Sequence, residues 1–136
     1  MSADNLDVSQ WVRFAQMDYD YALKSSETFC PVPIEIICYH CQQSAEKILK
    51  AYAIAKNQTL IKTHDLIVLL KQCGQYLSDF NNYANACVAL TSYATISRYP
   101  SNTKITEAQM KQALKNAENI LEFTKTQLVK LGYAVN

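Results

Sequence analysis

The sequence predicts an all-α fold, an up-and-down antiparallel bundle of about five helices. Residues 34–55 carry apolar side chains at steps of three or four, which is the period of one helix face. No segment alternates polar and apolar residues between turn residues, so no strand is expected. The few glycines and prolines fall between the periodic segments or at their ends, where they stop helices.

The first helix is expected over residues 9–25, where one stripe of the helix is apolar. Ser9 is its expected N-cap, because a serine side chain can accept a hydrogen bond from an unpaired backbone N–H group. Pro31 and Pro33 follow and cannot lie inside a helix, so they separate the first helix from the second.

The second helix, residues 34–55, is expected to be the central element of the bundle. Its main apolar face is continuous, while Ile36 and Ile54 add apolar side chains to the otherwise polar opposite face. A helix with apolar residues on two faces is usually covered from two sides. We therefore expect the second face to meet a partner or a ligand.

Two further helices are expected before residue 100. Thr63 is the expected N-cap of a helix over residues 64–73, and Gly74 suits the position just after its C-terminus. Ser78 is expected to cap the next helix, which ends near Arg98.

The fifth helix has the clearest start. Thr106 and Gln109 form a T-x-x-Q capping box, and the helix is expected to run to about residue 131, where Gly132 ends it. The connections are short and no linker interrupts the chain, so residues 1–136 are expected to form a single domain.

Composition narrows the classes of function. A formal net charge of +1 gives no global attraction to nucleic acid or to a membrane surface. No apolar run approaches the roughly 20 residues that cross a membrane. The polar N-terminus and the odd number of cysteines, five, predict a cytoplasmic protein with reduced thiols.

The motifs for metal or cofactor chemistry are weak. The two glycines cannot supply a glycine-rich phosphate loop. Cys38 and Cys41 form a lone C-x-x-C on the apolar stripe of the second helix, and the additional ligands that zinc requires are missing. We expect both cysteines to be core residues, with no metal, no cofactor and no catalytic residue.

Two groups of residues could contact phosphate. Lys47 and Lys50 lie one turn apart on the polar face of the second helix, and the alternative is a solvated or dimer-facing stripe. Arg98 could hold a phosphate in a bidentate way while the Tyr99 ring stacks on a base. Alternatively, Arg98 caps the helix end before Pro100.

Three segments together resemble the HEPN domain family of all-α nucleotide-binding or RNA-processing domains. The first is residues 40–51, with the pattern of glutamine, A-E-K and L-K-A. The second is T-H-D-L at residues 63–66, and the third is R-Y-P at residues 98–100. The family's up-and-down helical bundle agrees with the helices predicted above.

The resemblance implies a function and partners. Such domains commonly form homodimers, and many act with a small nucleotidyltransferase, often as a toxin–antitoxin pair. The resemblance also implies a nucleotide or phosphate site made by Lys47, Lys50, His64, Arg98 and Tyr99.

Many members of the family are metal-independent ribonucleases, whose signature is an arginine followed, four to six residues later, by a histidine. Arg98 lies in the corresponding region, but no histidine follows His64, and Lys104 is a poor proton carrier near neutral pH. The expected function is therefore a non-catalytic nucleotide-binding or interaction module. The alternative is a ribonuclease with a degenerate site around Arg98. A third hypothesis is RNA binding without cleavage.

Overall fold

The structure, a computed structural model, describes residues 3–95, 100, 102 and 104–135. These residues form an all-α bundle without strands. Two short 3-10 helices, η1 and η2, flank α4. The elements are α1 (Ala3–Thr28), α2 (Ile34–Ala55), α3 (Leu66–Gly74), η1 (Ser78–Tyr83), α4 (Ala84–Thr91), η2 (Ser92–Ala94) and α5 (Glu107–Lys130).

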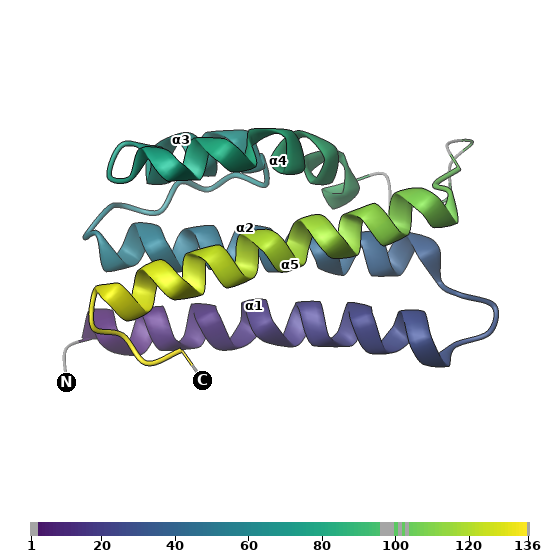
Figure 1. The fold of residues 1–136 in the computed structure, drawn as a ribbon, viewed down its shortest axis with the longest axis horizontal. Helices are drawn as coiled ribbons and strands as arrows, with labels where there is room; N and C mark the ends of the chain where they lie inside the picture. Colours follow the sequence, from purple (N-terminus) through teal and green to yellow (C-terminus); the bar gives the residue numbers. More distant parts are fainter. Residues whose placement is uncertain (1–2, 96–99, 101, 103, 136) are drawn as a thin grey trace.

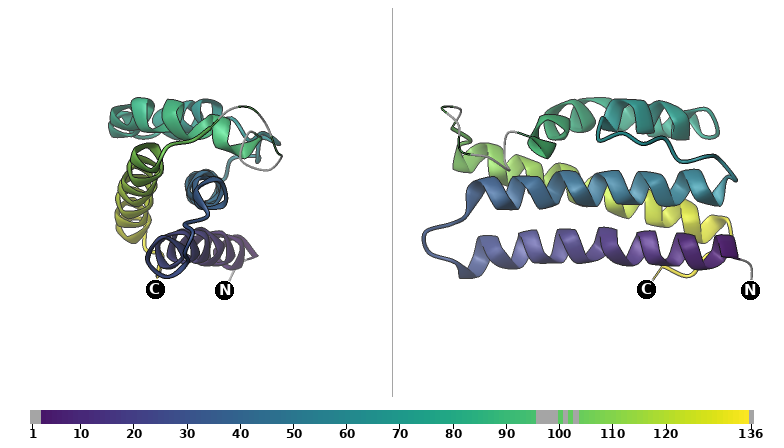
Figure 2. Two further views of the ribbon diagram at one scale, coloured as in Figure 1. Left: turned by 90° about the vertical axis from the view of Figure 1, so that its right-hand side faces the viewer. Right: turned by 180° about the vertical axis from the view of Figure 1, so that it is seen from behind.

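The other four α-helices enclose α2 on three sides. α1 runs antiparallel to α2, and α5 lies along both of them (Figure 1). α3 and α4 form a layer above α2 and α5, as the end-on view in Figure 2 shows. In the part of the chain that the structure describes, no helix covers the fourth side of α2 (Figure 2). None of the described helices is both long and apolar enough to cross a membrane.

The central helix begins and ends where the sequence predicts, and its main apolar face is buried. The buried side chains of this face include Ile37, Cys41, Ala45, Ile48 and Tyr52. Above them, the Phe80 ring lies between Tyr52 and Phe123, with ring centroids 4.6 and 5.0 Å apart. Aromatic packing therefore joins the α3–α4 layer to α2 and α5.

α1 begins at Ala3, so the prediction of Ser9 as its N-cap is wrong. Ser9 lies inside the helix. The preceding residues include no glycine or proline, and Asp4 and Asp7 favour the positive N-terminal end of a helix dipole.

α3 is capped by Asp65 rather than by Thr63. The Asp65 side chain accepts a hydrogen bond from the backbone N–H of Ile67 at 2.9 Å, while the Thr63 hydroxyl accepts one from the N–H of Asp65. The predicted place of Gly74 is also wrong, because it is the last residue of α3 and Gln75 after it is still helical in conformation. A Cβ atom at Gly74 would lie 2.8 Å from Asn81 Oδ1, the end of an exposed side chain.

The predicted fourth helix is divided among η1, α4 and η2, and the Ser78 side chain does not cap it. Asn81 and Asn82 lie at the division, and asparagine side chains compete for backbone hydrogen bonds, which lowers helix propensity. The predicted end near Arg98 lies outside the described residues.

α5 confirms its predicted start. The Thr106 hydroxyl accepts from Gln109 N–H at 3.1 Å, and Gln109 Oε1 accepts from Thr106 N–H at 2.8 Å. Gly132 follows the helix with φ of +98°, a conformation that glycine adopts without strain. Leu131, at the predicted end of the helix, is its C-cap residue and is 40% exposed.

Candidate interaction face

The uncovered side of α2 carries the exposed Ile36 and the half-buried Tyr39, Gln43, Lys47 and Lys50, and α1 packs alongside α2. We call this surface, together with the adjoining α1 side chains, the open face. Contacts across the two antiparallel helices fix their register. Lys50 Nζ lies 5.6 Å from the Trp11 ring centroid, and Lys47 Nζ lies 5.9 Å from that of Phe14.

Asp18 on α1 forms the first ionic cluster at this face. Its Oδ1 lies 2.9 Å from His40 Nδ1, and its Oδ2 lies 2.6 Å from Lys47 Nζ. Burial alone would raise the pKa of the Asp18 carboxyl, but hydrogen bonds from His40 and Lys47 outweigh burial and lower that pKa. Asp18 is therefore ionised at neutral pH and neutralises Lys47.

Glu46 on α2 forms the second cluster. Although Glu46 is only 4% exposed, its Oε1 lies 2.8 Å from His64 Nδ1 and its Oε2 lies 3.0 Å from Lys50 Nζ. Burial again acts to raise the pKa of the carboxyl, and the hydrogen bonds from His64, Lys50 and Gln42 lower it below the ordinary value. The charge of Lys50 is thus matched inside the same chain.

Gln42 extends the second cluster to the backbone. Its Nε2 donates to Glu46 Oε1 and to the carbonyl oxygen of His64, each at 3.1 Å. Thr91 Oγ1 accepts from Leu66 N–H at 3.0 Å and donates weakly to the same His64 carbonyl at 3.4 Å. This network ties α2, the start of α3 and the end of α4 together.

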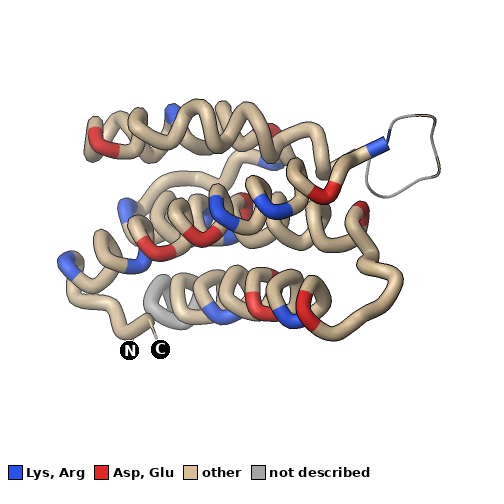
Figure 3. The backbone as a smooth tube through the Cα atoms, turned by 45° about the vertical axis from the view of Figure 1, so that its right-hand side comes forward, with Lys and Arg blue, Asp and Glu red and all other residues tan. Residues whose placement is uncertain are grey.

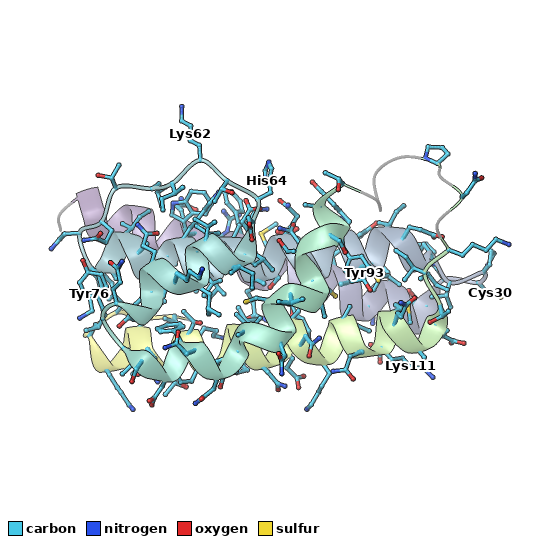
Figure 4. The ribbon with its side chains drawn as sticks, turned by 90° about the horizontal axis from the view of Figure 1, so that it is seen from above. Cys30, Lys62, His64, Tyr76, Tyr93 and Lys111 are labelled. Carbon is cyan, nitrogen blue, oxygen red and sulfur yellow. The ribbon has the colours of Figure 1, made fainter. Side chains whose placement is uncertain are left out.

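Of the five predicted site residues, Lys47 and Lys50 lie on the open face, and His64 lies in the segment before α3. Lys47, Lys50 and His64 are each bonded to a carboxylate of the chain. The His64 side chain is still 66% exposed, and Figure 4 shows it at the surface. Arg98 and Tyr99 lie outside the described residues.

Sequence reasoning missed the residues that organise this face, Asp18, Gln42 and Glu46. One signal was available, because Glu46 and Lys50 are four residues apart on a helix and can form an ion pair. No sequence signal could identify Asp18, because its contacts depend on the register of α1 against α2.

The open face is also rich in exposed apolar side chains. Phe14, Met17 and Tyr21 on α1 are 43%, 51% and 50% exposed, and Ile36 on α2 is 49% exposed. The three α1 residues are three and four positions apart, so they share one side of the helix. Figure 3 shows acidic and basic residues interspersed along the helices rather than gathered in one basic stripe.

The cysteines offer no reactive site at this face. Cys38 and Cys41 are buried, and burial raises the pKa of the Cys38 thiol to about 12. Among the described residues, no group of three or more histidine, cysteine, aspartate and glutamate side chains is arranged to hold a metal ion.

Comparison with known proteins gives a family model and two related folds. The model of the HEPN domain matches residues 8–127. A protein from Thermus thermophilus is 23% identical, with a TM-score of 0.77 over 88% of this chain and 96% of that chain. An archaeal HEPN homologue is also 23% identical, with a TM-score of 0.70 and the same coverage. No curated protein matches the chain.

Proposed function

The chain belongs to the HEPN domain family, and from this premise we propose that it is a non-catalytic interaction module. Its open face pairs with a second copy of the chain, and the resulting homodimer engages a nucleotidyltransferase-type partner in a toxin–antitoxin-like setting. The observation that carries the proposal is the combination, on one face, of exposed apolar residues with lysines that are neutralised internally.

The charge pairing makes this face suitable for burial. Removing an unpaired lysine from water is costly, whereas Lys47 and Lys50 already have their counter-ions in Asp18 and Glu46. Interface cores are enriched in aromatic residues and methionine and depleted of charge. Phe14, Met17 and Tyr21 supply those residue types in one stripe.

The size of a stable interface sets how much surface the open face must contribute. A stable interface covers about 800 Å² on each partner, roughly a tenth of a small protein's surface. The accessible surface of the chain is 7674 Å². Because the same stripe lies on both copies, a two-fold arrangement would place Met17 and Tyr21 of one copy against the same stripe of the other.

Nucleotide binding by Lys47, Lys50 and His64, with Arg98 and Tyr99, stays a prediction. A phosphate group at Lys47 or Lys50 would compete with a carboxylate that is already bonded there. This competition favours the interaction role for the described part of the site. The ribonuclease alternative depends on Arg98; cleavage of RNA by purified protein, lost in Arg98→Ala, would support it.

Co-expression of two differently tagged copies in the native host tests the proposal. Purification through one tag should recover the second copy and, in stoichiometric amount, a nucleotidyltransferase. Met17→Lys with Tyr21→Lys should lose the second copy, because the added charges would be buried without partners. Val129→Lys is the matched control, since Val129 is 55% exposed on α5. Recovery of a second copy without a nucleotidyltransferase would refute the partner and leave the homodimer.

A further inference from the structure

A cavity of about 380 Å³ lies between α4, η2 and the first turns of α5. It is separate from the open face, because α5 packs on a different side of α2 (Figure 2). Figure 4 shows this region around the label of Tyr93, with Lys111 labelled on the first turns of α5. The volume is at the lower end of the range of about 300–1,000 Å³ for ligand pockets, so the cavity suits a small molecule.

One wall of the cavity consists of amide side chains on α5. Gln109, Gln112 and Asn116 line it and are spaced three and four residues apart, on one side of the helix. Gln112 Nε2 donates to Asn116 Oδ1 at 3.0 Å. This bond leaves Gln112 Oε1 as an acceptor and Asn116 Nδ2 as a donor, and neither makes another hydrogen bond to the described residues.

The remaining lining is apolar except for Ser92 and a single cation. Tyr93, Ile105 and Ala113 are buried and form apolar surface, with an aromatic ring among them. Lys104 is the one charged residue of the described lining, and it makes no ion pair with the described residues. Its charge, unlike that of Lys47, is available to a ligand.

We propose that this cavity binds a small anionic cyclic amide, a pyrimidine ring that carries one carboxylate or phosphate group. An adjacent N–H and C=O on the ring edge would match Gln112 Oε1 and Asn116 Nδ2. The flat ring would lie against the apolar wall that includes Tyr93, and the anionic group would lie near Lys104. The site is independent of the homodimer and uses none of the five residues predicted from the sequence.

Calorimetric titration of the full chain with orotate, uridine monophosphate, uridine and inorganic phosphate tests this site. At least one of the two anionic pyrimidines should bind, and whichever binds identifies the carboxylate or the phosphate as the recognised group. Uridine should bind more weakly because it lacks the charge, and inorganic phosphate should bind most weakly because it lacks the ring. Absence of binding by both anionic pyrimidines would refute the proposal.

Substitutions of residues that line the cavity test whether the ligand binds there. Lys104→Gln should weaken binding roughly ten-fold, whereas Lys111→Gln, which changes another exposed lysine that does not line the cavity, should not. Ala89→Phe should block the cavity, and because Ala89 is exposed the fold should tolerate the change. Binding that survives both Lys104→Gln and Ala89→Phe would overturn the assignment.

An NMR titration provides a readout that does not depend on a variant. The side-chain amide signals of Gln112 and Asn116 should shift on addition of the pyrimidine that binds. Shifts confined to residues around Lys47 and Lys50 would place the ligand on the open face and contradict the proposal. Binding should persist in the Met17→Lys, Tyr21→Lys variant, so failure of the homodimer and failure of this site are distinguishable.

Discussion

Glu46 Oε1 lies 2.8 Å from His64 Nδ1, which joins the middle of α2 to the segment just before α3. The same carboxylate binds Lys50 and Gln42, so one buried glutamate holds three side chains. The residues of the two family-like segments A-E-K and T-H-D-L therefore meet in a structural network.

Replacing Glu46 should destabilise the fold strongly. Glu46→Ala would leave Lys50, whose side chain is 11% exposed, without its counter-ion, and breaking such a pair costs about 3–5 kcal/mol. Urea denaturation measures the loss. Glu122→Ala is the matched control, because Glu122 is 61% exposed in its pair with Lys125 and should cost less than about 1 kcal/mol. Equal losses in the two variants would contradict the central role of Glu46.

Stability should fall in acid. The pKa values of Asp18 and Glu46 lie below their ordinary values of 3.8 and 4.5, so the folded state binds these two protons less readily than the unfolded state. Their contribution is present above the unfolded pKa values and is lost as pH falls through the folded ones. Urea midpoints between neutral pH and pH of about 3 should show this decline. An unchanged acid slope in an Asp18→Asn, Glu46→Gln double variant would count against the two clusters.

The two glycines should respond oppositely to alanine. Gly74→Ala should be neutral or stabilising by up to about 1 kcal/mol, because Gly74 is helical and the exposed Asn81 side chain can rotate away from the new Cβ. Gly132→Ala should cost about 1 kcal/mol, because its φ of +98° is unfavourable for alanine although nothing lies within 4 Å. Thermal unfolding of both variants measures the contrast, and a larger loss at Gly74 would reverse this assignment.

Removing the capping hydroxyl of α5 should cost about 1 kcal/mol. In Thr106→Ala, the Gln109 N–H would lose its acceptor at the start of the helix. Thr126→Ala serves as control and should change stability little, because Thr126 is an exposed threonine of the same helix whose hydroxyl donates to the Glu122 carbonyl within the helix. The same thermal unfolding measurement applies, and an equal effect of both changes would argue against the capping box.

The elements that the sequence predicts correctly are those with local physical causes. The bounds of α2 follow from its apolar period and from Pro33, and the start of α5 follows from the Thr106–Gln109 capping box. Thr63 is the predicted cap of α3, but Asp65 occupies that position, because both side chains are capable of capping and the sequence pattern does not distinguish them. The sequence does not predict the division at η1, because the helical period of the apolar residues continues past Asn81 and Asn82.

The candidate site could be predicted only in part. Lys47 and Lys50 follow from the polar stripe of α2, and His64 follows from the family-like segment. Their partner Asp18 is 29 residues from Lys47 in the chain, and only tertiary packing brings the two together. A sequence pattern therefore cannot show that the charges of Lys47 and Lys50 are neutralised. This neutralisation changes the role that is expected of the two lysines.

The mass of the purified chain in solution, measured by light scattering during size-exclusion chromatography, tests the open face most directly. The wild-type chain and Val129→Lys should each give about twice the monomer mass of 15.4 kDa. Met17→Lys with Tyr21→Lys should give the monomer mass while retaining helical circular dichroism. A monomeric wild type, or a dimer that survives both substitutions, would contradict the assignment of the open face as the interface.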